Sequence, residues 1–376
     1  MNCELKITEE SFQLDAFDFE LPKENIAQHP AEERDGSRLL VCNVVEDSVS
    51  HREFSDILEY LSKGDVLVVN DSKVFPARFF GHKTTGGKVE MLLLHYPIIR
   101  QSESGSLDLS TILADVTVLL RSSKRPKSGA VLSFGEKLRA VVGELEPGGK
   151  VRLCLEMYPH AGEGMDDILS AYGIMPLPPY IERSEDGAEE DVQRYQTRYA
   201  AEVGSVAAPT AGLHFSDRLL AAARKKGVSL TTITLHVGYG TFAPVRAEDI
   251  RDHQIHAEHV KVSTDSAQLI NKVKGDGGRV WAVGTTTVRT LEAATDENGV
   301  VGPLEGLCDL FIYPGYRFRA VDNLITNFHL PKSSLLFLVS ALAGKERVLS
   351  CYEEAVAKGY RFYSYGDAMA VITKGK

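Results

Sequence analysis

Two histidines stand at the ends of predicted elements in this 376-residue chain, where a side chain can meet a substrate. His214 lies in PTAGLHF just before a predicted helix, and His236 ends a β-branched strand before VGYGTF. An imidazole changes charge near neutral pH, so it can accept or donate a proton during a reaction. Either histidine alone is also explained as a structural residue, but two at neighbouring loop ends favour one shared pocket.

A carboxylate follows in the segment DHQIHAEHVKV. If this segment is a strand, alternation places Glu258 on the same face as Val260 and Val262. A carboxylate turned toward a core needs a hydrogen-bonding or charged partner, or it holds its proton more tightly than usual. Either situation suits a general base, so Glu258 joins the two histidines as a residue for proton transfer.

The same segment contains His253, His256 and His259, which raises the possibility of a metal site. The spacing is not HExxH, and a strand would point His256 and His259 to opposite faces. We therefore expect no metal site here.

The stretch GTTTVRTLE follows the apolar strand RVWAV directly. We expect Thr285 or Thr286 to cap a helix there, with Thr287 in its first turn and Arg289 projecting from it. Free backbone N–H groups at a helix start can bind an anionic group of a ligand. An ordinary capped helix explains the pattern equally well.

Strands alternating with helices are predicted to position these residues. Apolar periodicity indicates helices over 217–226 and 265–274, and strands over 229–237 and 279–283. A strand over 310–313 and a long helix from about residue 333 follow. This order favours an α/β main domain with a mixed sheet and helical cover.

A second kind of pattern interrupts the first. Short β-type segments such as KVEMLLLHY, DVTVLL and VRLCLEM are separated by Gly, Ser and Pro turns. We expect a small all-β barrel domain over 66–154, inserted into an α/β catalytic domain formed by 1–65 and 155–376.

Charge is unevenly distributed along the chain. The formal net charge is −10, yet residues 63–152 hold 14 Lys and Arg against 9 Asp and Glu. The loop RSSKRPKSG within this region is either a solvated connection between strands or a contact for RNA phosphates. Only the β module is therefore expected to face a polyanion.

The chain closely resembles, nearly end to end, the S-adenosylmethionine:tRNA ribosyltransferase-isomerases of queuosine biosynthesis. The resemblance is carried by the stretches FDFELPKENIAQHPAEERDGSRLLV, VNDSKVFPARF, YQTRYAAEVGSVAAPTAGLHFS, LHVGYGTFAPV, HAEH, VGTTTVRTLE, FIYPGYRF, LITNFHLPKSSLLFLVSALAG and YRFYSYGDAM. Small departures from the family pattern are Lys73, Phe75 and His259.

The resemblance implies a monomer with a β-barrel inserted in an α/β domain. It implies an enzyme that moves the ribosyl part of S-adenosylmethionine onto 7-aminomethyl-7-deazaguanine (preQ1) at the wobble position of a tRNA. The ribosyl part is isomerised, epoxyqueuosine-tRNA forms, and adenine and methionine leave. S-adenosylmethionine would be a co-substrate, tRNA carrying preQ1 the partner, and no metal would be needed.

Roles for named residues follow as hypotheses within this reaction. His214, His236 and Glu258 are assigned to proton transfer. The methionine carboxylate is assigned to the helix start at Thr285, Thr286 and Thr287 together with Arg289. Tyr239 and Phe242 are assigned to stacking on a base. Contacts with tRNA phosphates are assigned to Arg78, Lys124, Arg125 and Lys127.

Two other functions remain open from the residues alone, a non-catalytic RNA-binding protein and a metal-dependent hydrolase built on the histidine cluster. A methyltransferase is a third, but the Gly-rich first loop that is usual for that class is missing. The first residues, MNCELKITEESFQL, lack the pattern of a signal peptide, and the longest apolar run is too short to cross a bilayer. We expect a cytoplasmic protein without membrane contact.

Overall fold

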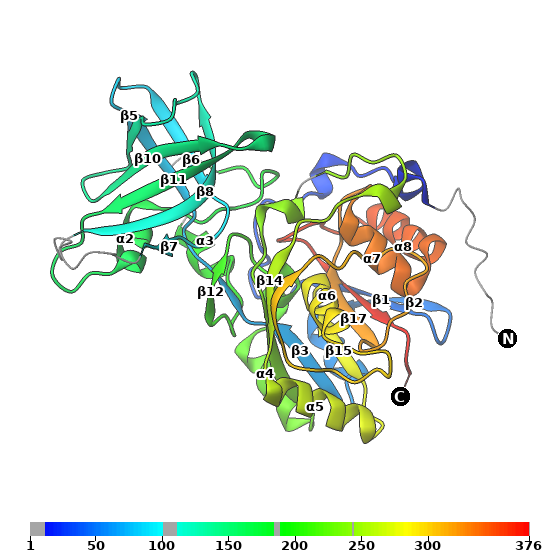
Figure 1. Cartoon of the computed structure of the whole chain (residues 1–376). Coiled ribbons are helices and arrows are strands. Elements are labelled where there is room, and N and C mark those ends of the chain that lie inside the picture. The colour runs from blue at the N-terminus through cyan, green and yellow to red at the C-terminus, as the bar shows by residue number, and fades with distance from the viewer. Residues whose placement is uncertain (1–11, 101–110, 184–188, 243, 376) are drawn as a thin grey trace.

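The protein consists of a large α/β domain and a β-barrel that stands beside it (Figure 1). The computed structural model describes residues 12–100, 111–183, 189–242 and 244–375. In the described part of the chain, no helix is both long and apolar enough to span a membrane.

A nine-stranded mixed sheet forms the centre of the α/β domain. Its strands alternate apolar side chains between two faces, so that Val66 and Val68 enter one core while Leu67 and Val69 enter another. The sheet therefore needs helical cover on both sides. Its order is β16 (Leu304–Cys308), β14 (Glu258–Val262), β13 (Ser229–Leu235), β3 (Val66–Asn70), β15 (Val280–Val283), β17 (Asn323–Asn327), β18 (Ala368–Ile372), β1 (Arg38–Asn43) and β2 (Ser48–Glu53).

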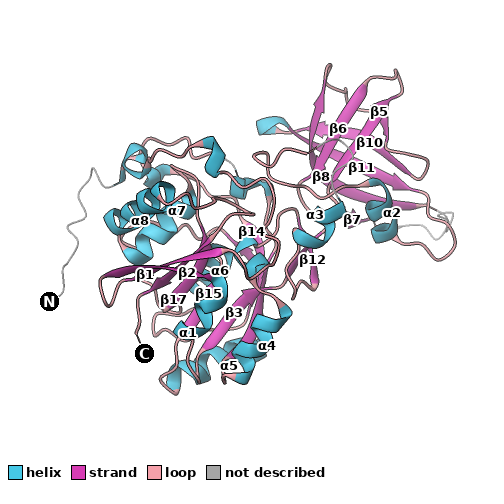
Figure 2. Cartoon of the chain, turned by 180° about the vertical axis from the view of Figure 1, so that it is seen from behind, coloured by secondary structure: helices cyan, strands magenta, loops and turns pink. Residues whose placement is uncertain are grey.

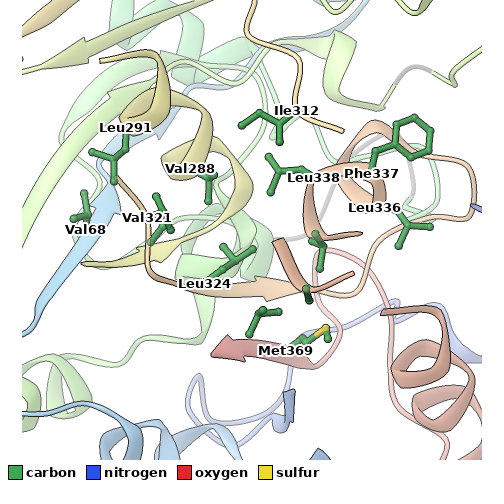
Figure 3. Packing of buried hydrophobic residues seen from close by; sticks show 14 of the residues in the cluster. Val68, Val288, Leu291, Ile312, Val321, Leu324, Leu336, Phe337, Leu338 and Met369 are labelled. Atoms are coloured by element: carbon green, nitrogen blue, oxygen red, sulfur yellow. The ribbon is translucent and has the colours of Figure 1, made fainter. Parts of the chain in front are cut away.

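Helices supply that cover in two layers, seen from both sides in Figures 1 and 2. One face carries α5 (Thr264–Gly275), α6 (Thr285–Ala293), α7 (Ser334–Ala343) and α8 (Lys345–Ala357). The other face carries the short α1 (Ile57–Tyr60) and α4 (Asp217–Lys225). Figure 3 shows the first core, where Val288 and Leu291 of α6 and Leu338 of α7 pack near Leu324 and Met369 of the sheet.

The four middle strands β13, β3, β15 and β17 run parallel to one another. Their carboxyl ends therefore meet at one edge of the sheet. In open α/β sheets this edge is where ligands bind.

The barrel is a separate closed sheet with its own core. Its last strand pairs with β8 and thereby closes a ring of six antiparallel strands, while α2 (Met165–Tyr172) packs apolar residues against its core. The ring contains β11 (Lys150–Met157), β10 (Leu138–Leu145), β9 (Val131–Ser133), β5 (Arg78–Lys83), β6 (Lys88–Leu93) and β8 (Ile112–Ser122), and β7 (Ile98–Ile99) pairs outside it.

Two short strands join the domains. The chain leaves the sheet through β4 (Ser72–Val74) and returns through β12 (Glu202–Ser205), which pairs with β4 in parallel, and α3 (Glu189–Arg194) precedes the return. The expected barrel boundary at 66 is wrong, because β3 pairs with β13 and β15 in the middle of the main sheet. Periodicity alone does not say which sheet a buried strand joins.

Other sequence expectations need correction. The expected strand over 310–313 does not form, and β16 and β17 flank that position instead. The helix predicted from residue 333 divides into α7 and α8, because Gly344 between them takes φ 89°. Short 3-10 turns complete the described elements: η2 (Leu14–Phe17), η3 (Lys23–Asn25), η4 (Phe54–Asp56), η5 (Pro147–Gly149), η6 (Thr210–His214), η7 (Tyr239–Phe242) and η8 (Ile250–Asp252).

Candidate functional site

A hollow of about 690 Å³, counted together with the open solvent space at its mouth, lies at the carboxyl edge of the parallel strands, and we call it the strand-end hollow. It is bordered by the residues that follow β13, β15 and β17 and by the start of α7. Hydroxyl and amide groups form most of its polar lining, which includes Thr210, Thr285, Thr286, Thr326, Asn327 and Ser364.

The start of α6 contributes two of the predicted residues to this hollow. Gly284, not a threonine, is the N-cap; its φ of 88° suits glycine, and it has no side chain with which to accept a hydrogen bond. Thr285 and Thr286 line the hollow, whereas Thr287 is fully buried and donates its hydroxyl to the Val283 carbonyl at 2.6 Å. Asn70 at the end of β3 donates to the Thr286 hydroxyl at 3.3 Å.

Another histidine, His329, lines the hollow although no role was predicted for it. Its Nε2 lies 2.9 Å from the Thr326 hydroxyl, and its backbone N–H donates to the Tyr352 hydroxyl at 3.1 Å. Burial lowers the pKa of His329 to about 3, since the charged imidazolium loses its hydration there. The imidazole is therefore neutral at physiological pH.

His214 stands one layer behind the hollow. Asn327, which lines the hollow, donates to His214 Nε2 at 3.1 Å, and the Nδ1 of His214 lies 2.8 Å from the Ser37 hydroxyl. The ring stacks on Phe54 with centroids 4.9 Å apart. Burial lowers the pKa of His214 to about 4, and both ring nitrogens already have partners. This geometry supports a positioning role through Asn327 better than direct proton transfer.

A larger hollow of about 1890 Å³, again counted with the adjoining solvent space, lies between the barrel and the main sheet, and we call it the interdomain hollow. Barrel residues Leu119 and Lys150 form one side, and Tyr239, Arg246 and Glu258 belong to the other. Leu335 borders both hollows, so the two adjoin at the start of α7.

Glu258 occupies the buried face of β14, as strand alternation predicted. Its Oε2 forms an ion pair with Arg289, and its Oε1 accepts from the Gly238 N–H at 2.9 Å. Both charged side chains are about 6% exposed, so the pair is held almost out of water. The carboxylate is thus fixed in place at the wall of the interdomain hollow.

The remaining contacts of Arg289 argue against its predicted role. Its Nε donates to the Leu310 carbonyl at 3.0 Å and its Nη2 to the Cys308 carbonyl at 3.3 Å. The guanidinium is therefore committed to Glu258 and two carbonyls of its own chain. It also borders the interdomain hollow and not the strand-end hollow beside the start of α6.

His236 borders neither hollow. Its Nδ1 lies 2.8 Å from the Ser72 hydroxyl, and its ring stacks on His259 with centroids 5.8 Å apart. Burial and, after it, the nearby His259 lower the pKa of His236. The shared pocket expected for His214 and His236 is not formed.

The three histidines of the segment DHQIHAEHVKV do not lie together either. His253 and His256 line the interdomain hollow, while His259 faces His236 on the other side of the strand. Within the described ranges, no three His, Cys, Asp or Glu side chains are placed so that they could hold a metal ion.

Of the predicted aromatic and tRNA-binding residues that the structure describes, Tyr239 lines the interdomain hollow itself. Tyr239 is 39% exposed, whereas the side chain of Phe242 lies outside what the structure describes. Arg78 pairs with Glu90 at 2.8 Å near a neighbouring hollow that Tyr239 also borders.

The basic loop, comprising residues 121–127, starts with the last two residues of β8 and continues toward β9, and it exposes Lys124, Arg125 and Lys127. Arg125 donates to the Gly149 carbonyl at 3.2 Å, in the turn whose Gly148 lines the interdomain hollow. Two parts of the barrel that are distant in sequence thus meet at the rim of that hollow.

Several residues that line the strand-end hollow were not predicted from the sequence: Thr326, Asn327, His329 and Ser364. Asn70, which donates to Thr286 of that lining, was not predicted either. A signal existed in the stretch LITNFHLP, where polar residues follow an apolar strand directly. A strand was not expected there, so its carboxyl end was not considered as a place for site residues.

Comparisons with known proteins extend over almost the whole chain. The model of a family described as "Queuosine biosynthesis protein" matches residues 14–371. The S-adenosylmethionine:tRNA ribosyltransferase-isomerase of Desulfotalea psychrophila is 51% identical over 369 residues, covering 97% of this chain and 99% of that protein. The protein of the same name from Desulforamulus reducens is 48% identical, covering 96% of this chain and 100% of that protein.

A solved structure is also similar. The crystal structure of S-adenosylmethionine tRNA ribosyltransferase from Thermotoga maritima has 36% sequence identity and a TM-score of 0.51. The likeness covers 95% of this chain and 100% of that one. The predicted fold class, a mixed-sheet α/β domain with a small barrel, is confirmed.

Proposed function

This chain belongs to the queuosine biosynthesis protein family, and on that premise we propose that it is an S-adenosylmethionine:tRNA ribosyltransferase-isomerase. It transfers and isomerises the ribosyl moiety of S-adenosylmethionine onto preQ1 at the tRNA wobble position. Epoxyqueuosine-tRNA, adenine and methionine are the products. The full-length match, at about half identity to proteins of that name, is the observation that carries this proposal.

The reaction combines proton transfers, which the protein must support, with the making and breaking of several bonds. A base must take a proton from the ribose carbon next to the sulfonium, whose positive charge makes that carbon acidic. Adenine leaves with the electrons of its glycosidic bond and must gain a proton. Together these steps open the ribose ring to an aldehyde and leave a carbon–carbon double bond beside the sulfonium. The aminomethyl nitrogen of preQ1 adds to that double bond and loses a proton, and the resulting carbanion beside sulfur closes a carbon ring on the aldehyde carbon, whose oxygen becomes an alkoxide. Epoxide closure breaks the carbon–sulfur bond, whose electron pair leaves with methionine as a neutral thioether.

Glu258 is our proposed proton acceptor. Of the three residues predicted for proton transfer, it alone lines either hollow, and its contacts with Arg289 and Gly238 hold its position. Such fixed placement of a catalytic group is worth a large part of a rate acceleration. Thr285 and Thr286 are proposed contacts for S-adenosylmethionine in the strand-end hollow.

The interdomain hollow is our proposed entry for the wobble nucleotide. Tyr239 offers an aromatic face there, and proteins read single-stranded bases by stacking on such faces. Lys124, Arg125 and Lys127 are proposed to hold the phosphates nearby, with Arg78 closer to the connecting segments. A cytoplasmic monomer acting on tRNA fits these roles.

Mass spectrometry of nucleosides tests the proposal. The purified protein is incubated with S-adenosylmethionine and a tRNA carrying preQ1, and a tRNA carrying unmodified guanine serves as the control. Epoxyqueuosine and released adenine are expected only with the first tRNA. A methylated base would indicate a methyltransferase instead, and tight tRNA binding without any product would indicate an RNA-binding protein. The alternative of a metal-dependent hydrolase is not favoured, because the chain belongs to a family of queuosine biosynthesis proteins.

A further inference from the structure

The two hollows meet at Leu335 but differ in charge. Among the described residues that line the strand-end hollow, none is Asp, Glu, Lys or Arg. The interdomain hollow is lined by charges of both signs, including Lys150, Arg246, Asp252 and Glu258. One substrate that spans Leu335 would therefore have a neutral environment at one end and a charged one at the other.

S-adenosylmethionine has this asymmetry. Its adenosyl half is neutral and has an aromatic base and two ribose hydroxyls, whereas its methionine half has an ammonium, a carboxylate and the sulfonium. Moving an ion into a site without charged partners costs far more than moving a neutral polar group that finds hydrogen bonds. The charge pattern of the hollows therefore distinguishes the two halves.

We propose that the strand-end hollow binds the adenosyl half of S-adenosylmethionine, and that the methionine half extends past Leu335 into the interdomain hollow. This inference rests on the proposed function. It replaces the sequence-based expectation that the start of α6 binds the methionine carboxylate. Arg289, the cation of that expectation, is committed to Glu258 and lies on the other side.

Aromatic rings and neutral hydrogen-bonding groups in the strand-end hollow match an adenosyl group. Tyr180 and Tyr363 both line it, with ring centroids 4.5 Å apart, and Phe328 adds a third ring. Thr326 and His329 hydrogen-bond each other at the same wall. A neutral imidazole can donate to or accept from an adenine edge or a ribose hydroxyl without repelling the nearby sulfonium.

The sulfonium then lies near the junction of the hollows, because it joins the two halves. Glu258 lines the interdomain hollow, which begins on the far side of Leu335. This placement brings the acidic ribose carbon toward the proposed proton acceptor, while the wobble nucleotide approaches from the barrel side.

Binding of a truncated ligand tests the inference. Calorimetry measures the affinity of 5′-methylthioadenosine, which has the adenosyl half without the amino acid, and of S-adenosylmethionine. Thr326→Val keeps the shape of the side chain but removes its hydroxyl, and His329→Gln is a second variant of the same wall. Both are expected to weaken the two ligands alike, about fivefold to tenfold for one lost hydrogen bond.

A control variant and a variant of the other hollow show where the loss of affinity arises. Thr231→Val removes a half-buried hydroxyl of β13 that bonds Ser266 away from both hollows, and it should change neither affinity. K150Q/R246Q removes two cations of the interdomain hollow, and it should weaken S-adenosylmethionine but not 5′-methylthioadenosine. Thermal melting confirms that each variant is folded.

Other outcomes overturn the inference. One is that Thr326→Val and His329→Gln weaken S-adenosylmethionine but leave 5′-methylthioadenosine unchanged. Another is that 5′-methylthioadenosine does not bind the wild-type protein at millimolar concentration. The nucleoside assay separates this inference from the proposed function. If both ligands bind as expected but no epoxyqueuosine forms, the proposed function is contradicted and the assignment of the hollow is not. If epoxyqueuosine forms but either contrary binding result is obtained, the assignment of the hollow is contradicted and the proposed function is not.

Discussion

The ion pair between Glu258 and Arg289 is the interaction on which the proposed proton transfer depends. Replacing Glu258 with Gln keeps an acceptor for the Gly238 N–H but removes the charge that can accept a proton. We expect turnover to fall by about 100-fold or more, in the range that loss of a general base produces. Glu305→Gln on the adjacent strand β16, where the side chain is 62% exposed, should stay within twofold.

The Gln variant also leaves Arg289 without its buried partner, which costs about 3–5 kcal/mol of stability. The double variant E258Q/R289M removes both charges, so it should recover most of the stability without recovering turnover. Adenine release measures the activity and urea unfolding the stability. Recovery of turnover in the double variant would show that Glu258 is not the base.

Two buried histidines predict how stability depends on pH. Burial lowers the pKa values of His214 and His329 to about 4 and about 3, against about 6.5 in the unfolded chain. Between these values the unfolded state binds more protons. Each histidine therefore contributes stability that is present above about pH 6.5 and is lost as the pH falls toward its folded value, by about 1.4 kcal/mol per pH unit.

The measurement is urea unfolding between pH 7 and pH 4.5, followed by fluorescence of Trp281. This is the only tryptophan of the sequence and it is fully buried in β15, so it reports unfolding of the α/β domain. His214→Gln should reduce the slope of the unfolding free energy against pH by up to about 1.4 kcal/mol per pH unit in this range, because one proton fewer is taken up on unfolding. Equal slopes in the variant and the wild type would contradict the buried neutral state of His214.

At the scale of elements, one glycine decides how the chain passes from α7 to α8. Gly344 has φ 89° and ψ 133°, a conformation that residues with a Cβ strongly disfavour. Gly344→Ala should therefore destabilise the protein by about 1–3 kcal/mol. Gly275 at the end of α5 has no positive φ and no atom within 4 Å of an added Cβ, so Gly275→Ala should stabilise by about 0.5–1 kcal/mol.

Urea midpoints of the two Ala variants, followed by Trp281 fluorescence, check this contrast. A Gly344→Ala midpoint equal to that of the wild type would show that the two helices can be joined without the glycine conformation.

In the molecule as a whole, the exposed basic residues of one loop lie on the barrel, whereas the strand-end hollow lies in the α/β domain. The chain has a formal charge of −10, but its barrel exposes a basic loop whose Arg125 contacts the rim of the interdomain hollow. A net negative protein can thus still present cations where tRNA would lie.

Neutralising that loop predicts a change in salt dependence. In K124Q/R125Q/K127Q, the slope of log affinity for tRNA against log salt concentration should become shallower by about 2. The reason is that fewer phosphates are neutralised by the protein, so fewer counterions are released when the tRNA binds. A matched variant, K63Q/R224Q/K225Q, removes three exposed cations at the opposite edge of the sheet and should leave the slope unchanged. Equal slopes for the wild type and the loop variant would remove the basic loop from the tRNA interface.

The class of fold, the presence of an inserted β module and the family could all be predicted from the amino-acid sequence. Apolar periodicity and turn residues are local properties, so α4, α5, β13 and the barrel strands could be predicted from them. Alternation in β14 likewise predicted that Glu258 is buried and needs a partner.

Which residues meet in space could not be predicted from the sequence and follows from the tertiary structure. Parallel pairing of β13, β3, β15 and β17 brings Asn70, Thr286 and Asn327 to one edge, although they lie more than 200 positions apart at the extremes. It also separates His214 from His236, which local position had suggested as neighbours. Strand order and helix packing depend on contacts between distant parts of the chain, and these contacts leave no mark in the spacing of a single sequence.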